Sequence, residues 1–319
     1  MDGDNSPRVA ILVLTYNNAE TVRDCLNSVC NQDYRNIELH ILDNASHDDT
    51  VANIPTALTD RLRINSKNIG YAAGMNQLFE NVSQLASFVV FLNSDCELDA
   101  SFVSRSVQRL ADRSDCAALA PLVWRLGASE SVVDGGMLRI TKTMRVRLVP
   151  IGEAVKSDKP NGSCPVYRIN ALDDLARQSG YRGFDEKYDT YGEDIDLALR
   201  LTRRGWSTYF DPSITARHQR SGSSGTKSIL GRRGRLRRNV LSARYVNAIG
   251  HLRFYDLLWV VPLLITQDLA LICLSFARRD VTAGQDVAAA WKTVLQRARK
   301  KRLEVRGITR LVRDSDDGN

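Results

Sequence analysis

A chain of 319 residues, of which 43% are hydrophobic, has room for one large α/β core with an appendage, so a substantial buried core is expected. Six scattered cysteines without a C-x-x-C pair exclude a disulfide framework and indicate reduced thiols of an intracellular protein. The 44 lysines and arginines against 37 acids give a net charge of +7, and the excess is localised near the end of the chain.

The first hundred residues alternate between short apolar runs and helical patterns. Each apolar run is followed by a polar loop, as is typical of strands in an α/β fold. The alternation predicts right-handed βαβ units and a mostly parallel central sheet flanked by helices. No glycine-rich phosphate loop follows the first run, which argues against a dinucleotide or P-loop site. We expect strands at 9–14, 37–42, 62–65 and 88–92, and helices from Val22 and over 72–85.

The apolar run 88–92 ends abruptly at Asn93-Ser94-Asp95. A strand buried on both faces would deliver Asp95 to the carboxyl edge of the sheet, where ligands of open α/β sheets bind. A carboxylate there can coordinate a divalent metal or anchor a metal bound to a phosphate. The alternative is that Asp95 only begins a turn. Asp99 is expected to cap the helix that begins near Ala100.

The second half of the core has a less regular pattern. A helix over 100–113 and a strand over 117–123 precede an irregular, hairpin-bearing excursion over 127–160. The segment 166–172 is either a strand or the start of a helix. Acids then open a helix near Glu193, and Gly205 ends it. Two short strands are expected at 206–210 and 214–218.

The composition changes beyond the serine- and glycine-rich boundary at 221–225, so we expect domains at 1–225 and 226–319. No acid occurs between Asp211 and Asp256, whereas arginines accumulate there. Such a block predicts affinity for a polyanion, either nucleic acid or anionic lipid headgroups.

The segment 257–277 is strongly apolar and barely reaches the length of a membrane span. Because it carries Asp268 near its middle, we expect a monotopic amphipathic hairpin broken at Pro262, and a buried core helix is the alternative. A basic helix is expected from Lys292 to Arg313. The polar start lacks the apolar region of a signal peptide, which predicts a catalytic part on the cytoplasmic face of the inner membrane.

Six motifs occur in order between residues 8 and 225. They are Thr15-Tyr-Asn17, Asp43-Asn-Ala-Ser46, the stretch Asn68 to Asn76, Asn93-Ser-Asp95, the stretch Gly192 to Leu197, and His218. Each motif alone is a weak signal, but the ordered set resembles the inverting nucleotide-sugar enzymes of glycosyltransferase family 2, and in particular the bacterial rhamnosyltransferase-like branch. The resemblance implies the GT-A form of the α/β fold, with a C-terminal helical appendage that associates with the membrane.

The resemblance also implies a nucleotide-sugar site at the ends of the first strands. Asp43 would accept a hydrogen bond from the ring N–H of the base, and Thr15 and Tyr16 would contact base and ribose. Small and amide-bearing residues would let the backbone approach the ribose or diphosphate closely, although a turn and a helix start would also explain them. The implied donor-site residues are Thr15, Tyr16, Asn17, Asp43, Asn44, Asn68, Gly70, Asn76, Asn93 and Ser94.

In the same resemblance, Asp95 would hold a Mn²⁺ or Mg²⁺ ion that neutralises the diphosphate, with His218 as the second ligand. A lone histidine is also often structural. Asn93 stands where the family motif has its first acid, which leaves fewer hard ligands and predicts modest metal affinity until the donor binds.

Displacement with inversion needs a general base beside the attacking hydroxyl. We expect Asp194 to be that base, Glu193 to bind the acceptor sugar and Asp196 to serve structurally. Charge stabilisation of a helix N-terminus is the alternative, and it explains one acid better than three.

The sequence thus predicts an enzyme that moves a sugar, with rhamnose expected, from a dTDP- or UDP-linked donor to a hydroxyl of a lipid-linked or growing bacterial surface glycan. A nucleotidyltransferase is a second possibility, but its phosphate loop is missing. A basic nucleic-acid- or lipid-binding module on an α/β scaffold is a third. Aromatics for base stacking are scarce in the arginine block, so no nucleic-acid partner is expected.

Overall fold

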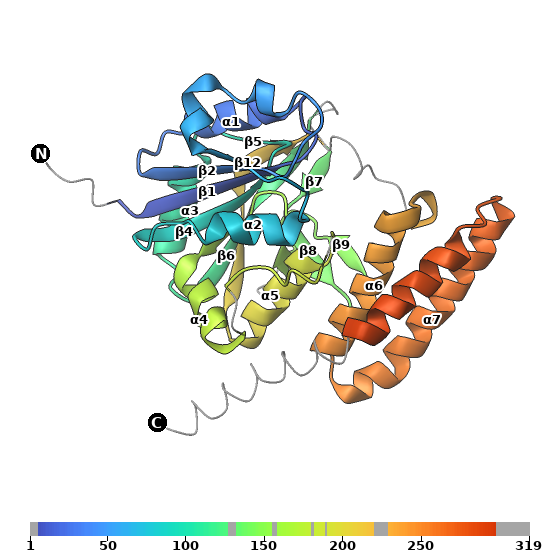
Figure 1. Ribbon diagram of the computed structural model, residues 1–319. Coiled ribbons are helices and arrows are strands. Elements are labelled where there is room, and N and C mark those ends of the chain that lie inside the picture. Colours follow the sequence, from blue (N-terminus) through green and yellow to red (C-terminus); the bar gives the residue numbers. More distant parts are fainter. Residues whose placement is uncertain are drawn as a thin grey trace, which may run out of the picture.

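The computed structural model describes residues 6–126, 132–154, 158–179, 182–188, 190–219 and 229–297. A central sheet covered by helices forms the first part, and a group of long helices lies against one side of it (Figure 1). The expected boundary at 221–225 and most of the expected basic helix, 298–313, lie outside the described residues.

The central sheet has the strand order β3-β2-β1-β4-β11-β6-β12-β5, and β7 pairs with β6. The first four strands in this order are mutually parallel, β11 is antiparallel to both of its neighbours, and β12 is parallel to β6. The mostly parallel GT-A-like sheet is therefore confirmed. The strands are β1 (Arg8–Thr15), β2 (Ile37–Asp43), β3 (Leu62–Ile64), β4 (Ala86–Asn93), β5 (Cys96–Leu98), β6 (Cys116–Arg125), β7 (Val133–Gly135), β11 (Val166–Arg168) and β12 (Ser207–His218).

Alternate residues of β1 supply two hydrophobic cores, one on each face of the sheet. Ile11 and its neighbours two residues away pack with α1 and α3, whereas Leu12 and its neighbours pack with α2, α4 and α5. This burial on both faces explains why the strand reads as a continuous apolar run. The helices are α1 (Val22–Cys30), α2 (Tyr71–Phe79), α3 (Phe102–Ala111), α4 (Ile169–Ser179) and α5 (Glu193–Arg203).

Three local predictions differ from the structure. Helix α2 ends at Phe79 instead of 85 because the following residues turn back toward β4. Asp99 does not cap α3, since Ser101 occupies the N-cap position and the Asp99 carboxylate accepts a hydrogen bond from Thr215. The two short strands expected near 206–218 are one strand, β12, whose register shifts between Asp211 and Thr215.

The segment 166–172 combines both expected elements, since β11 passes directly into α4. The excursion that follows β6 contains β7 and a small second sheet of order β10-β8-β9, formed by β8 (Met137–Ile140), β9 (Val146–Leu148) and β10 (Lys159–Pro160). Residues 127–131 and 155–157 of this excursion lie outside the described ranges.

The C-terminal part contains α6 (Gly234–His251), α7 (Phe254–Ala277) and a further helix at 283–297. Helix α7 runs through Pro262 without a break, so the predicted hairpin is wrong. Pro262 lies on the exposed side of α7 and not on the stripe that packs inward. The inward stripe is Val260, Leu264, Asp268, Leu271 and Ser275.

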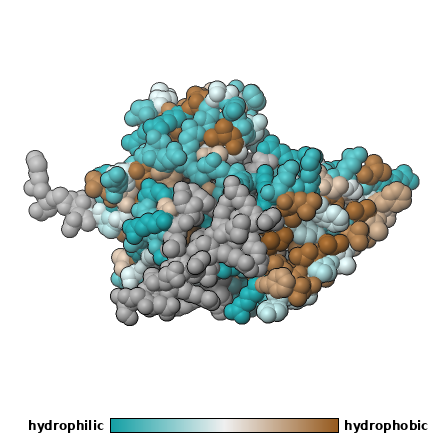
Figure 2. Space-filling model, turned by 60° about the horizontal axis from the view of Figure 1, so that its bottom comes forward, coloured by the Kyte–Doolittle hydropathy of each residue, from teal (hydrophilic) through white to brown (hydrophobic). Residues whose placement is uncertain are grey.

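Most of the apolar surface of α7 is exposed. Among the described residues, α7 alone is long and apolar enough to cross a membrane, and only 22% of its most apolar stretch is buried. Figure 2 shows brown hydrophobic side chains gathered over the helical part. The exposed large side chains on α7 are Phe254, Tyr255, Leu258, Trp259, Leu263, Ile265, Leu269, Leu274 and Phe276.

Acids within the helical part neutralise some of the arginine block. Arg237 is fully buried and makes ion pairs with Asp280 (2.5 Å) and Asp286 (3.4 Å). Arg244 binds Asp268 at 2.6 Å. These two arginines therefore hold helices together and are not available as free cations for a polyanion.

Candidate active site

The ends of β1, β2 and β4 meet at one edge of the sheet. Thr15 pairs with Asp43 across β1 and β2, and Leu14 pairs with Asn93 across β1 and β4. The first, second and fourth predicted motifs therefore converge at the carboxyl edge, as parallel register requires.

The loops after β1 and β2 are tied together by side chains. Asp43 is 1% exposed, and its carboxylate accepts hydrogen bonds from the Ser46 amide (2.8 Å) and hydroxyl (2.5 Å). The Asn17 amide donates to the same Ser46 hydroxyl at 2.9 Å. Asn17 and Ala45 both have positive φ values, 54° and 66°. Such conformations persist only where the surrounding structure fixes them, so this pair of loops is preorganised.

Two further predicted residues, Asn68 and Gly70, belong to the adjoining loop. The Asn44 side chain is 2% exposed and donates to Asn68 Oδ1 (3.0 Å) and to the Gly70 carbonyl (3.2 Å). Gly70 has a φ of 90° immediately before α2, a conformation that favours glycine. Asn76 lies apart from this loop, because both ends of its amide bind the backbone of Phe184.

Asp95 and His218 are brought together by strand pairing. His218 at the end of β12 pairs with Cys96 of β5, and its Nε2 atom lies 3.0 Å from Asp95 Oδ1. The other ring nitrogen, Nδ1, lies 2.7 Å from Asp134 Oδ2, and Asp134 in turn accepts hydrogen bonds from Arg125. Asp95, His218, Asp134 and Arg125 thus form a chain of four interacting side chains. The two predicted metal ligands are at one end of it.

Asp134 lies at an irregularity in the pairing of β6 with β7. Val123 pairs with Gly135 and Trp124 pairs with Val133, so Asp134 is the additional residue of a β-bulge. A bulge bends its strand and redirects a side chain, and here the carboxylate reaches His218. Sequence reasoning did not identify Asp134, because register is not visible in a single sequence. The only signal is an acid within a short β pattern.

The charges around His218 decide its protonation. Burial alone would lower the pKa of His218, but the hydrogen bonds and negative charges of Asp134 and Asp95 raise it to about 9. Burial raises the pKa of the Cys96 thiol, which lies beside Asp95 and His218.

The donor atoms of Asp95 and His218 fit a divalent metal. Two ligands at right angles, each about 2.1 Å from the metal, lie about 3.0 Å apart. Asp95 Oδ1 and His218 Nε2 have that separation, and Asp134 binds the remaining ring nitrogen as carboxylates commonly do behind metal-bound histidines. A site with one histidine and one carboxylate from the chain leaves most coordination positions for phosphate oxygens and water.

A cleft of about 1160 Å³ joins this centre to the start of α5. Glu193 is 8% exposed and Asp194 is half-buried, and both line the cleft. Burial raises the pKa of Asp194, although its own backbone amide and those of Ile195 and Gly192 oppose that shift. The Tyr71 hydroxyl, which was not predicted, donates to Asn93 Oδ1 at 3.1 Å and also lines the cleft.

The predicted residues therefore form two groups. Asn93, Asp95, His218, Glu193 and Asp194 line the cleft. The others lie at or near the same sheet edge but do not line it; they are Thr15, Tyr16, Asn17, Asp43, Asn44, Asn68, Gly70, Asn76 and Ser94. The Ser94 hydroxyl donates a hydrogen bond to Asn18 Oδ1 (2.9 Å). This bond links the loop that carries Asn93 and Asp95 to the loop that carries Thr15, Tyr16 and Asn17.

Helix α6 holds the start of α5 from the other side of the cleft. Gly192 has a φ of 96°, and a Cβ atom there would lie 2.7 Å from the Ala243 Cβ. Asn247 donates to the Gly192 carbonyl at 3.3 Å and accepts a hydrogen bond from the Tyr188 hydroxyl at 2.5 Å. His251 binds Asp196 at 2.8 Å. The contacts recur every four residues along one face of α6.

Asp196 serves structurally, as predicted. It is fully buried and also pairs with Arg200 at 2.8 Å.

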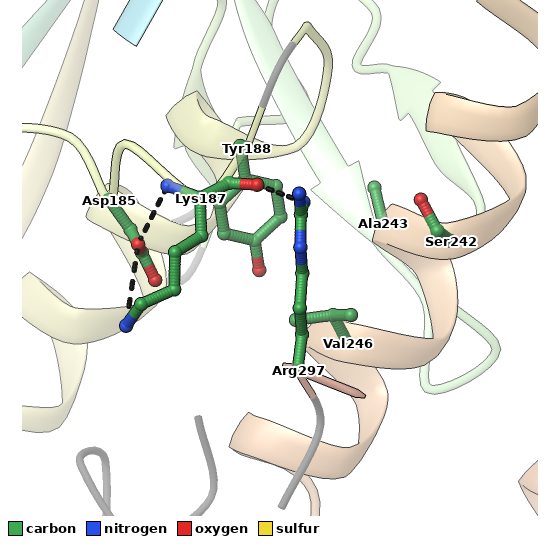
Figure 3. A pocket seen from close by; sticks show the side chains of 7 residues that line it. All are labelled: Asp185, Lys187, Tyr188, Ser242, Ala243, Val246 and Arg297. Carbon is green, nitrogen blue, oxygen red and sulfur yellow. Dashed lines mark hydrogen bonds and ion pairs between the residues drawn. The ribbon is translucent and has the colours of Figure 1, made fainter. Parts of the chain in front are cut away.

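Figure 3 shows the segment before α5, with Asp185 and Lys187, opposite Val246 of α6, and Arg297 between them. The space enclosed there is about 10 Å³, which is room for about one water molecule.

Comparisons with known proteins agree with this geometry. Residues 10–157 match the model of the family described as Glycosyl transferase family 2. An N-acetylglucosaminyl-diphospho-decaprenol L-rhamnosyltransferase of Mycobacterium tuberculosis is 24% identical over 248 residues, which cover 67% of this chain and 77% of the relative. An N-acetylglucosaminyltransferase of Mesorhizobium japonicum is 24% identical over 225 residues, which cover 67% of this chain and 52% of that protein.

Two solved structures share the fold over nearly the whole chain. The mannosyltransferase PcManGT from Pyrobaculum calidifontis, in complex with GDP-Man and Mn²⁺, has a TM-score of 0.56 and 16% identity over 99% of this chain and 89% of that one. TarS 1–349 of S. aureus in complex with UDP-GlcNAc has a TM-score of 0.54 and 16% identity over 97% and 92%.

Proposed function

We propose a specific reaction for this chain, which belongs to glycosyltransferase family 2 and is an inverting, nucleotide-sugar-dependent enzyme with a GT-A core. In this reaction a sugar, with rhamnose as the leading candidate, passes from a dTDP- or UDP-linked donor to a hydroxyl of a lipid-linked or growing surface glycan. The observation that carries the proposal is the single cleft in which Asp95 and His218 lie together with Asp194.

The relatives support the finer parts of this proposal. The mycobacterial relative is named as a rhamnosyltransferase that acts on a sugar linked by a diphosphate to decaprenol. Its identity of 24% makes rhamnose and the lipid-linked acceptor a proposal for this chain. Structural relatives were solved with UDP-GlcNAc or with GDP-Man and Mn²⁺.

In the proposed donor site, Asp43 and the loops of Thr15 to Asn17 and Asn44 to Gly70 hold the nucleoside. The preorganised turn at Ser46 fixes the carboxylate of Asp43 at the end of β2. Asn93 and Ser94 continue this surface toward the cleft. Asn76 would act indirectly, by holding the segment at Phe184.

Asp95 and His218 would hold a Mn²⁺ or Mg²⁺ ion, and Asp134 would orient the imidazole. When bound, such an ion neutralises the negative charge that develops on the departing nucleoside diphosphate.

Asp194 is the proposed general base. Its carboxylate takes the proton of the acceptor hydroxyl as the oxygen forms a bond to the anomeric carbon of the donor. The bond from that carbon to the nucleoside diphosphate breaks, and the diphosphate leaves with the electron pair. Glu193, next to Asp194 on the cleft wall, would hydrogen-bond the acceptor sugar. Burial keeps Asp194 more basic than an exposed aspartate, which suits proton acceptance.

We further propose that the enzyme lies on the cytoplasmic face of the inner membrane through α7. A membrane-spanning orientation of α7 is disfavoured, because Asp268 in the middle of the helix binds Arg244, Tyr245 and Trp291 and would lose these contacts. An in-plane orientation leaves these contacts intact and buries only the exposed apolar side.

A donor panel tests the reaction. The full chain is incubated with Mn²⁺, a polyprenyl-diphospho-N-acetylglucosamine acceptor, and dTDP-rhamnose, UDP-N-acetylglucosamine or GDP-mannose, and nucleotide release is measured. Acceptor-dependent release from dTDP-rhamnose is expected. Thermal protection by a duplex oligonucleotide, with none from UDP or dTDP plus Mn²⁺ at the same salt, would instead favour a binding module.

A further inference from the structure

The cleft extends well beyond the metal centre and Asp194. Its far wall consists of the β8–β9 hairpin on one side and of α6 and α7 on the other. In the proposed function the donor and the acceptor hydroxyl occupy the end near Asp95, so the remaining length is available to whatever carries the acceptor hydroxyl.

Cationic side chains line this far part of the cleft. Arg145 and Arg147 lie on the hairpin and are exposed, and neither guanidinium makes an ion pair or hydrogen bond with any residue that the structure describes. Arg147 pairs across the hairpin with Arg139, whose own charge is neutralised by Asp158 at 2.8 Å. Arg147 therefore carries the uncompensated positive charge of this cross-strand pair.

A second pair of arginines lies on the opposite wall. Arg232 stacks over the Tyr191 ring at 4.8 Å, directly before Gly192. Arg244 keeps its Nη2 atom on Asp268, whereas its buried Nε atom has no hydrogen-bond partner among the described residues. Guanidinium groups from both walls thus line the same cleft.

Apolar side chains line this part of the cleft as well. Ile229, Leu230 and Leu274 line it, and the buried Leu241 and Leu271 pack with Ile229 and Leu230. Leu274 is 54% exposed and belongs to the same apolar surface of α7 that we expect to contact the membrane. One cleft is thus lined by the acids near α5, by arginines and by apolar side chains that adjoin the exposed side of α7.

We propose that this limb of the cleft is a binding site for the diphosphate and first isoprene units of a lipid-linked acceptor, an assignment that rests on the proposed function. Arg145, Arg147 and Arg232 bind the diphosphate, since guanidinium forks match phosphate oxygens in geometry and charge. The isoprenoid chain lies over Leu230 and Leu274 and continues along the exposed side of α7. The acceptor sugar then projects toward Asp194.

The test measures binding of farnesyl diphosphate to the full chain by calorimetry in EDTA, so that no metal at Asp95 can capture the diphosphate. Inorganic pyrophosphate and detergent-solubilised farnesol serve as the separated halves of the ligand. Farnesyl diphosphate is expected to bind at least about ten-fold more tightly than either half, because both contacts are made together. Equal affinity for pyrophosphate and farnesyl diphosphate would overturn the apolar part of the site.

The double variant Arg145→Gln with Arg147→Gln is expected to lose at least about ten-fold in affinity for farnesyl diphosphate. Its affinity for UDP or dTDP with Mn²⁺ should stay unchanged. The matched control is Arg35→Gln, an exposed arginine in the loop between α1 and β2 that should change neither affinity. Unchanged farnesyl diphosphate binding in the double variant would overturn the proposal.

Two other outcomes would also overturn it. An equal loss of nucleotide affinity would assign the arginines to the donor, and a loss confined to phosphatidylglycerol vesicles would assign them to lipid headgroups. Failure of the proposed function is separately visible, because a chain that binds farnesyl diphosphate but neither nucleotide would lack the donor site and retain this one.

Discussion

Asp194 combines the position and the environment of a general base. It lies at the first turn of α5 and lines the cleft, and burial raises its pKa. We expect Asp194→Asn to lower the turnover number by roughly 10²–10⁴-fold, the usual contribution of a positioned base. Affinity for UDP or dTDP with Mn²⁺ should survive. Asp60→Asn, an exposed acid outside the cleft, is the control, and retained transfer in Asp194→Asn would move the base elsewhere.

The raised pKa of Asp194 also predicts how the rate depends on pH. The proposed base must be ionised to take a proton, so the rate should fall as the pH drops through the folded-state pKa of Asp194. Because burial raises that pKa, the acid limb should have its midpoint above 3.8, the usual value for an aspartate. The measurement is kcat against pH at saturating donor, acceptor and Mn²⁺. A midpoint at or below 3.8 would contradict the assignment.

Asp134 orients His218 through Nδ1, and this contact leads to a prediction about metal affinity. Asp134→Asn should weaken Mn²⁺ binding by about 10–100-fold, which is typical when the carboxylate behind a metal-bound histidine is lost. The Mn²⁺ concentration that gives half-maximal thermal protection by UDP or dTDP measures it. Asp112→Asn, on the exposed end of α3, should leave this concentration unchanged, and an unchanged value in Asp134→Asn would show that His218 does not depend on Asp134.

At the scale of single residues, sequence alone could indicate the acids that end strands and open helices. Asp95 follows an apolar strand and Asp194 opens an amphipathic helix, and both features are local. Asp134 acts through a bulge, and Tyr71 acts by reaching Asn93 from another element. Both depend on register and packing between distant segments, which residue patterns do not contain.

At the scale of elements, the junction of α5 and α6 carries a direct test. Gly192 and Gly205, at the two ends of α5, both have left-handed backbone conformations, with φ values of 96° and 87°. A Cβ at Gly192 would meet Ala243 at 2.7 Å, whereas a Cβ at Gly205 meets nothing within 4 Å. Gly205→Ala should therefore cost only the conformational penalty of about 1–2 kcal/mol.

Gly192→Ala should cost more than Gly205→Ala in thermal stability, and it alone should lower the turnover number, because it displaces the start of α5 or the face of α6. Thermal unfolding and nucleotide release measure the two effects. Equal behaviour of the two variants would mean that α6 does not position the start of α5.

The elements with strong periodicity were predictable, and the failures have local physical causes. The parallel strands read as apolar runs because both faces of the sheet are covered. Helix α7 was expected to break at Pro262, but the proline lies on the exposed side and the helix continues. Strand β12 was expected as two pieces, whereas its pairing with β6 continues and only shifts register between Asp211 and Thr215.

For the whole molecule, the exposed side of α7 predicts membrane binding. Leu258, Leu263 and Leu269 are 60%, 39% and 51% exposed, so replacing all three by Gln should leave the fold intact. Binding to vesicles that contain phosphatidylglycerol should fall by at least about ten-fold, because each buried CH₂ contributes about 0.8 kcal/mol. Vesicle flotation measures the bound fraction. The control is Leu85→Gln, because Leu85 is 74% exposed and lies outside the C-terminal helices. Unchanged flotation would exclude α7 as the contact surface.

Helix α6 both holds the start of α5 and lines the cleft, so a hybrid enzyme that lacks α6 would lose both contributions. One face of α6 fixes Gly192 and Asp196, while the neighbouring Arg244 and Leu241 line the far limb of the cleft. A graft of residues 6–219 onto a foreign anchor would therefore keep the loops that we propose to bind the nucleoside, yet it would remove the contacts that hold the start of α5. An exchange of donor specificity between two such enzymes should therefore transfer α6 together with residues 6–219.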